Sequence, residues 1–415
     1  MRINIKKLLQ HFELYGVNSL FNYSFYYIRL FFKKPFKYFE DYLRVRNISK
    51  PDKNLGKFSE YLSEKNVEVL TQRFASREKK LTNCNKYSLK EFKQYDSRKN
   101  LRLLLFLPEH VNNSKNFVEN YLTLNVRKSA EDAGHLVKQF WGNAVINSLY
   151  ADEQERLYNF EDTIIKFTPD LLVIDSNFSI RHKTFTIENF LKLKKNYQFK
   201  VLLISPDFDI HRLKYWGERL ADFVLSSRPS LMNQVEFIPN NKKIILPGVP
   251  YFEKFFSNIN LKEYDLYYSG SNIRQRKIFI DAAIKSGLNV KENFGNLLSN
   301  KSPTYMEFLS NISKARMTFG NGYVKRNNIL IAGRFIESLL SKTVTLYETG
   351  PDVNEFFIPF EHYVPVSNIH DFVKSAQYLK LNSTLLDKIS LSAYNYYSEN
   401  YSSRLFWNYI TYKLS

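Results

Sequence analysis

The pattern of apolar positions after residue 100 predicts a series of buried strands that alternate with helices. Most of the predicted strands are short, mainly apolar runs, which are typical of strands covered on both faces. The segments between the runs carry apolar residues at helical spacing. The predicted strands cover 101–107, 135–141, 170–175, 200–205, 223–225 and 243–246, and the predicted helices cover 116–132, 152–167 and 185–197.

A second series of the same kind follows the proline-containing stretch LPGVPYFEKFF. Its predicted strands are 264–268, 289–292, 317–319 and 343–347, and its predicted helices are 274–286, 305–315 and 329–340. Strands that alternate with helices indicate a parallel sheet with helices on both faces. The predicted fold class is therefore α/β, with two Rossmann-like domains facing a cleft, one over 101–250 and one over 251–395. Residues 396–415 predict a further helix.

Residues 1–100 precede this alternation and form a basic, aromatic and helical segment. The first fifty residues hold ten Lys/Arg, three acidic residues and thirteen Phe/Tyr. An interfacial helix has this character, because its aromatics insert among lipid headgroups while its lysines meet anionic lipid. Residues 1–46 therefore predict either contact with an anionic membrane surface or a helix packed on the protein or on a second subunit.

The amino-acid composition excludes some classes of function and favours others. The 415 residues carry 60 Lys+Arg against 41 Asp+Glu, a net charge of +19, which favours a polyanionic partner. The single cysteine excludes an internal disulfide framework and a multi-cysteine zinc site. Neither a signal peptide nor an apolar stretch of about 18 residues is apparent. We expect a cytoplasmic protein, either free or peripheral on the inner face of the membrane.

The sharpest local feature is the sequence DLYYSGSNIRQRKIF, where a predicted strand ends and a helix begins at once. The small residues Ser269, Gly270 and Ser271 let backbone amides approach a phosphate at the positive end of the helix. Arg274 and Arg276 follow and can pair with the same anion. A dinucleotide loop would need further glycines and a P-loop would need Gly-Lys-Ser/Thr, so both are disfavoured. The alternative is an ordinary strand-to-helix turn.

A second feature is Glu337, which lies on a predicted helix that leads into a strand. Such a helix begins at the carboxyl edge of the sheet, where doubly wound folds bind their ligands. A carboxylate there can accept hydrogen bonds from both hydroxyls of a ribose. The alternative is a solvated carboxylate or an ion-pair partner.

Together these features resemble the donor half of GT-B glycosyltransferases, notably the group-1 type that includes spore-maturation-like enzymes. The resemblance covers roughly 243–412 and rests on the loop at 269–274, on RFIESLLS at 334–341 and on Gly-Pro-Asp at 350–352. It implies that the loop holds a donor diphosphate with Arg334 nearby, that Glu337 binds the ribose, and that the final helix crosses back onto the first domain. Ile329 replaces the first carboxylate of the common Glu-x7-Glu motif, and Lys342 replaces a small glycine. The motif therefore does not predict retaining chemistry.

Catalytic groups are expected from loops that follow the strands of the first domain. An inverting transfer needs a base that deprotonates the acceptor hydroxyl. His110 is our first candidate, and the others are Glu109, Asp175, Asp207 and Asp209. The alternative for each of these residues is that it takes no part in catalysis. Asp207 and Asp209 also form an Asp-x-Asp sequence, which some glycosyltransferases use to bind a metal. A chain of this composition is expected to contain such a triplet by chance, so we predict no metal and no cofactor.

The leading functional hypothesis is a metal-independent glycosyltransferase. It would move a sugar from a nucleotide-diphosphate donor to a glycan, a lipid-linked saccharide or a protein, in cell-surface polysaccharide or glycoconjugate synthesis. Arginines and helix amides would stabilise the departing diphosphate in place of a metal. The alternatives are a non-catalytic polyanion or nucleic-acid binding protein and a GT-B-fold sugar-nucleotide epimerase. No nucleic-acid motif occurs, so nucleic acid is not the expected partner.

Overall fold

The structure is a computed structural model of the chain, in which residues Gly56–Ser415 form one compact unit. The predicted membrane-contact segment 1–46 lies outside the described residues. No helix in the described part is long and apolar enough to cross a membrane. The described residues are 64–75, 84–95, 100–108, 120–140, 153–176, 185–205, 210–256, 261–270, 274–294, 303–320, 323–325, 328–329, 331–348 and 350–415.

The first α/β domain is built on a parallel sheet with the order β2-β1-β3-β4-β5-β6 within the described chain. Strand β1 lies between β2 and β3, so the winding of the chain reverses there, which is where open α/β sheets bind ligands. The strands are β1 (Arg102–Phe106), β2 (Leu136–Gln139), β3 (Leu171–Asp175), β4 (Lys200–Ser205), β5 (Phe223–Ser226) and β6 (Lys243–Ile245). The helices are α4 (Tyr121–Asp132), α5 (Glu153–Phe167), α6 (Ile187–Tyr197), α7 (Ile210–Arg212), η6 (Leu213–Glu218), α8 (Pro229–Met232) and η7 (Asn240–Lys242).

Alternate residues of these strands enter two different cores. Leu103 and Leu105 of β1 pack in the core that includes α4, whereas Leu104 and Phe106 pack in the core that includes α5 and α6. This follows from the period of two along a strand, which directs successive side chains to opposite faces. Because both faces are covered, the strand reads as an unbroken apolar run.

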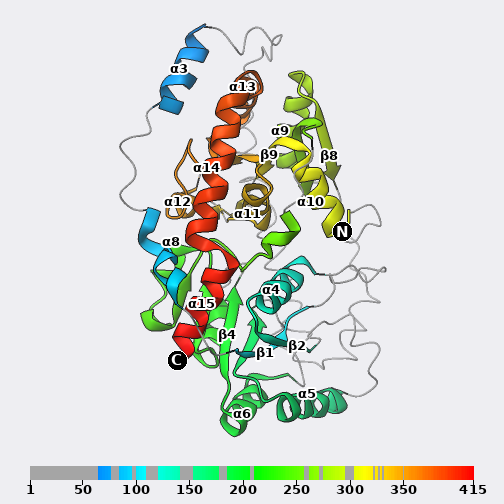
Figure 1. Ribbon diagram of the computed structural model, residues 1–415, viewed down its shortest axis with the longest axis vertical. Coiled ribbons are helices and arrows are strands. Elements are labelled where there is room, and N and C mark those ends of the chain that lie inside the picture. The colour runs from blue at the N-terminus through cyan, green and yellow to red at the C-terminus, as the bar shows by residue number, and fades with distance from the viewer. Residues whose placement is uncertain are drawn as a thin grey trace, which may run out of the picture. The chain divides into compact units, whose positions relative to one another are not determined.

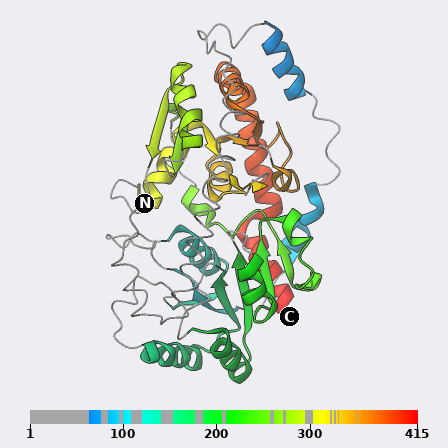
Figure 2. The ribbon, with the colours of Figure 1, turned by 180° about the vertical axis from the view of Figure 1, so that it is seen from behind.

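The second α/β domain repeats this plan with the parallel order β13-β12-β9-β7-β8. Its switch point lies between β7 and β9, which end at Gly270 and Gly320. Figures 1 and 2 show the helices of this domain around its sheet. The strands are β7 (Tyr264–Gly270), β8 (Val290–Phe294), β9 (Ala315–Gly320), β12 (Val344–Glu348) and β13 (Val364–Val366). The helices are α9 (Arg274–Lys285), α10 (Tyr305–Ser313), α11 (Gly333–Leu340), α12 (Pro351–Asn354) and α13 (Ile369–Leu381).

Helix α11 begins four residues later than the predicted helix 329–340. Ile329 belongs instead to β11 (Asn328–Ile329), which pairs antiparallel with β10 (Tyr323–Lys325). The helix ends at Leu340, and two residues further on Lys342 has a φ of 49°, in the left-handed region that glycine adopts without steric cost. The ammonium of Lys342 lies 4.6 Å from the ring centroid of Tyr394, a cation–π contact that opposes this cost.

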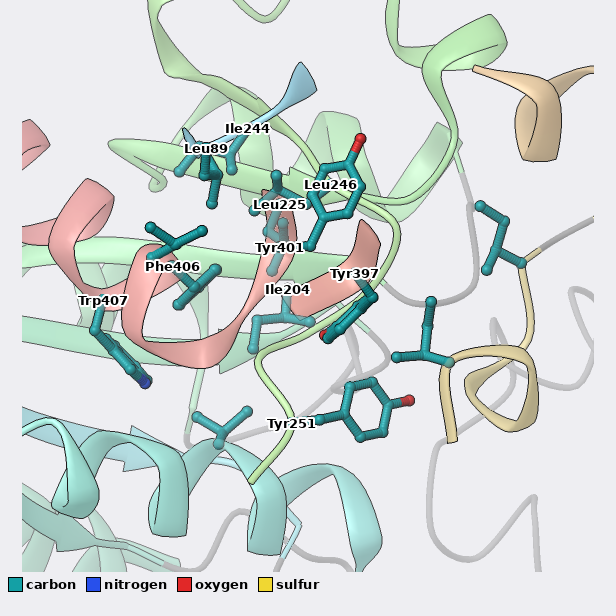
Figure 3. Close-up of a cluster of buried hydrophobic side chains, with 14 of the residues drawn as sticks. Leu89, Ile204, Leu225, Ile244, Leu246, Tyr251, Tyr397, Tyr401, Phe406 and Trp407 are labelled. Carbon is teal, nitrogen blue, oxygen red and sulfur yellow. The ribbon is translucent and has the colours of Figure 1, made fainter. Parts of the chain in front are cut away.

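The last two helices connect the domains. Helix α14 (Ser383–Tyr401) packs on α11 and α13, whereas α15 (Ser403–Leu414) packs on α4 of the first domain. The indole N–H of Trp407 donates to Ser129 Oγ over 3.1 Å. The chain changes direction between the two helices, at Ser402 and Ser403. This point lies within the range 396–415, for which one helix was predicted. Phe406 and Trp407 belong, with Ile204 and Leu225 of the first sheet, to one cluster of buried side chains, part of which Figure 3 shows.

The linker between the domains also holds helix α15 in place. Glu253 of η8 (Glu253–Phe256) accepts from the backbone N–H of Ser403 over 2.6 Å and from its hydroxyl over 2.5 Å. A carboxylate at this position caps the helix and complements its dipole. The linker and the crossing helix are therefore tied together.

The described parts of the first hundred residues pack on both domains. Helix α3 (Glu64–Ala75) contacts α13, where Phe74 stacks on Tyr378 with ring centroids 5.4 Å apart. The short turns η3 (Cys84–Tyr87) and η4 (Lys90–Gln94) lie near the last helices, and Leu89 N–H donates to the Asn400 carbonyl over 2.9 Å. This part of the chain is thus built into the α/β unit.

Candidate functional site

The candidate site is the carboxyl end of β7, where Arg334 reaches back from the first turn of α11. The guanidinium Nη1 donates to the carbonyl oxygen of Ser269 over 2.5 Å. It also lies over the ring of Tyr268, 5.5 Å from the centroid. A Cβ atom added to Gly270 would come within 2.7 Å of Arg334 Nη1 and of the Tyr268 hydroxyl, so a larger residue would require these side-chain ends to shift. The structure thus brings three of the sequence-predicted residues together.

Arg276, on the first turn of α9, adds a second cation at this end of the sheet. Burial lowers the pKa of Arg276, the Tyr268 phenol opposes this effect, and the charge of Arg334 lowers the pKa further. The last effect shows that the two guanidiniums act on each other. Two cations and the start of α9 at one strand end form an environment that favours an anion.

Glu337 lies one turn beyond Arg334 on the same helix, which places the two side chains on one face. Its side chain is 3% exposed. Burial raises the pKa of Glu337 to about 7, while a hydrogen bond from Tyr305 and the charge of Arg334 lower it. The carboxyl group therefore titrates near neutral pH. Because it is buried, contact with a ribose requires neighbouring side chains to move.

Tyr305, which lowers the pKa of Glu337, is hydrogen-bonded to Asn125 of the first domain. Asn125 Nδ2 donates to Tyr305 Oη over 2.9 Å and to the carbonyl of Tyr121 over 2.8 Å. Asn125 Oδ1 accepts from the backbone N–H of Phe252 in the linker over 3.0 Å. A capping box of Thr304 and Glu307 fixes the start of α10, so that Tyr305 is its first residue.

On the other side of the switch point, Tyr347 anchors the start of α11. Its hydroxyl accepts from the backbone N–H of Ala332 over 3.0 Å. Its ring fills the space beside Gly320, where a Cβ atom would come within 2.3 Å of the ring. The glycine at the end of β9 is therefore required for the position of Tyr347 and for the entry into α11.

The remaining predicted residues are placed as follows. Asp175 ends β3 in the first domain and is buried. Arg274 is the first residue of α9, and its side chain lies outside the described part. The other predictions, Ser271, Glu109, His110, Asp207 and Asp209, lie outside the described residues. Within the described chain, no group of three or more His, Cys, Asp or Glu residues could hold a metal ion.

Sequence reasoning missed the residues that surround the predicted ones, namely Asn125, Tyr268, Tyr305, Gly320 and Tyr347. One weak signal was available, because Asn125 lies inside helix α4 although asparagine has a poor helix propensity. The tyrosines gave none, since a tyrosine at a helix start or inside a buried strand is usually a core residue.

The sequence matches no protein-family model and no curated protein. The sucrose-phosphate synthase of Thermosynechococcus elongatus superposes with a TM-score of 0.54 at 11% identity, over 75% of this chain and 98% of that chain. A glycosyltransferase from Rickettsia africae superposes with a TM-score of 0.50 at 13% identity, over 76% and 98% of the two chains.

At such low identity these likenesses show the fold alone. The protein has the GT-B fold, with two parallel-sheet α/β domains, and the predicted fold class is confirmed. The structural neighbours are GT-B glycosyltransferases, whereas the resemblance to spore-maturation-like enzymes stays a prediction. The roles of the individual site residues also stay predictions.

Proposed function

We propose that the protein is a glycosyltransferase that moves a sugar from a nucleotide-diphosphate donor to an acceptor hydroxyl. One observation carries the proposal: the guanidinium of Arg334 is bound to the end of β7 beside Gly270, and a second arginine, Arg276, lies on the first turn of the helix α9 that follows this strand. The site lies at the switch point of the second sheet, where this class of sheet binds ligands. The GT-B fold supports the proposal.

In the proposed reaction, the positive charge of the two arginines acts on the diphosphate leaving group. The bond between the anomeric carbon and the diphosphate oxygen breaks, and its electron pair stays on the diphosphate. A new bond forms from the acceptor oxygen to the anomeric carbon, and the acceptor proton passes to a base. Arg334 and Arg276 would stabilise the charge that develops on the diphosphate, which is the role a metal takes in other enzymes.

The other roles belong to the same proposal. Ser269, Gly270, Ser271 and Arg274 would complete the diphosphate site, and Glu337 would accept the ribose hydroxyls. Glu109, His110 and Asp207 remain the proposed sources of the base. The acceptor, which is a glycan, a lipid-linked saccharide or a protein, and the attachment of residues 1–46 to an anionic membrane stay predictions.

The test is donor binding by isothermal titration calorimetry against a panel of nucleotide diphosphates and nucleotide sugars. Arg334→Gln and Arg276→Gln should each weaken binding of the preferred ligand about tenfold or more, because a charge-assisted hydrogen bond contributes about 1.5–3 kcal/mol. The matched control is Arg316→Gln, which changes an arginine near the amino end of β9, at the opposite edge of the sheet. Unchanged affinity in both site variants would reject the assignment.

Two further outcomes separate the competing functions. Salt-steep binding to DNA or RNA without nucleotide-sugar binding would favour the non-catalytic alternative. Epimerisation of the donor without an acceptor would favour the epimerase. Turnover that persists in excess EDTA is expected if the arginines replace a metal.

A further inference from the structure

The hydroxyl of Tyr268 is a buried polar group to which no described residue makes a hydrogen bond. Tyr268 is 1% exposed, and its ring packs against Phe294 and Phe319, with centroids 5.0 and 6.3 Å away. The neighbouring Tyr267 differs, because its hydroxyl accepts from Asn293 Nδ2 over 3.1 Å. A buried hydroxyl without a partner is rare and costs stability, so its presence in β7 calls for an explanation.

The Tyr268 hydroxyl shares one small space with the guanidinium of Arg334. A Cβ atom added to Gly270 would lie 2.7 Å from Tyr268 Oη, 2.7 Å from Arg334 Nη1 and 2.9 Å from Arg334 Nη2. Three polar groups therefore converge beside the Cα atom of Gly270, at the end of β7. The φ of Gly270 lies outside the left-handed region, so the glycine supplies space here rather than an unusual backbone conformation.

The groups that meet in this space are donors of hydrogen bonds. An arginine side chain only donates, and the Tyr268 hydroxyl has a proton of its own to donate. The Ser269 carbonyl accepts from Arg334 Nη1 over 2.5 Å. Arg276, on the first turn of α9, interacts electrostatically with the Tyr268 phenol but offers no acceptor for its proton. An anion with several acceptor oxygens, such as a diphosphate, complements this set.

We propose that Tyr268 is a further binding residue for the donor, whose hydroxyl donates to a diphosphate oxygen beside Gly270. This inference rests on the proposed function and adds a residue to it. The Arg334 guanidinium lies over the Tyr268 ring, so the anion reaches the buried hydroxyl when Arg334 exchanges the Ser269 carbonyl for the diphosphate. A charge-assisted hydrogen bond is stronger than one to a neutral carbonyl, which favours the exchange. The hydroxyl is then unpaired in the free protein and paired in the complex.

The test is Tyr268→Phe, which removes one oxygen and keeps the ring. The first readout is calorimetric binding of inorganic pyrophosphate, a probe that depends on neither base nor sugar, alongside the panel of nucleotide diphosphates. We expect both affinities to fall about tenfold, because one hydrogen bond to a charged group is lost. The second readout is the urea midpoint of the free protein. It should stay the same or rise, because the substitution breaks no hydrogen bond there.

The matched control is Tyr363→Phe, in the same domain. Tyr363 is also buried, but its hydroxyl donates to Asn354 Oδ1 over 2.5 Å. Removing this paired hydroxyl should lower the urea midpoint and leave pyrophosphate binding unchanged, which is the opposite pattern. A second variant, Gly270→Ala, places a methyl group at the point where the three polar groups meet. It should weaken pyrophosphate binding at least as much as Tyr268→Phe does.

The outcomes separate this inference from the proposed function. Unchanged affinities in Tyr268→Phe would overturn the role of the hydroxyl and leave the glycosyltransferase standing. A lower urea midpoint in Tyr268→Phe would also overturn it, because the hydroxyl would then be paired in the free protein. If the native protein binds pyrophosphate through Tyr268 but binds no nucleotide sugar, the contact with an anion stands and the proposed function is rejected. If it binds neither ligand, both proposals are overturned.

Discussion

A buried ion pair between the two domains offers the sharpest test of how they are held together. Arg228 follows β5 of the first domain, and Asp352 lies on α12 of the second. Arg228 Nε donates to Asp352 Oδ2 over 2.8 Å, and the backbone N–H of Ser230 donates to Oδ1 over 2.8 Å. The side chains are 3% and 1% exposed, so solvent screens the pair very little.

Replacing Asp352 by alanine leaves the guanidinium of Arg228 buried and uncompensated. Breaking one side of a buried pair costs about 3–5 kcal/mol. Replacing both partners by apolar residues of similar volume, Arg228→Met with Asp352→Leu, removes the stranded charge. The double variant should therefore recover most of the stability that Asp352→Ala loses.

The assay is urea unfolding followed by circular dichroism and by tryptophan fluorescence, with the first transition compared between variants. The matched control is Asp281→Ala, which breaks the exposed pair of Lys277 and Asp281 and should cost about 0.5 kcal/mol or less. A loss below about 1 kcal/mol in Asp352→Ala, or a double variant as unstable as the single one, would refute the argument.

Two further predictions concern other buried contacts. Gly320→Ala should lower the free energy of unfolding by about 1–3 kcal/mol, because the new methyl group would overlap the buried ring of Tyr347; an unchanged urea midpoint would contradict this. Burial lowers the pKa of His362 to about 3, so between pH 6.5 and 3 the unfolded chain binds a proton that the native state does not. His362 should therefore lower the free energy of unfolding by about 1.4 kcal/mol per pH unit as the pH decreases through that range, in addition to the fall caused by the buried His135, whose pKa is lowered to about 4. His362→Gln, which can still accept the Ile358 N–H, should remove that slope, and equal slopes in both proteins would contradict the assignment.

The strand and helix pattern was open to sequence analysis because it depends on local spacing. Strand β4 occupies the predicted range 200–205, and β3 and α5 begin one residue inside theirs. The start of α11 was not predicted, because β11 forms only by pairing with β10. Lys342 stands where the sequence resemblance would place a small glycine, and it adopts the backbone conformation that glycine favours.

The alternation of strands and helices and the division into two domains could be predicted from the sequence, since each depends on neighbours in the chain. Which side chains meet at the end of β7 depends instead on contacts between distant segments. Arg334 reaches the Ser269 carbonyl from 65 positions away, and Asn125 reaches Tyr305 from 180. Local periodicity carries no information about such pairs, because they form only when the sheets are wound and the linker brings α4 beside α10. The same packing buries Glu337 and moves its pKa toward neutrality, which its place in the sequence does not indicate.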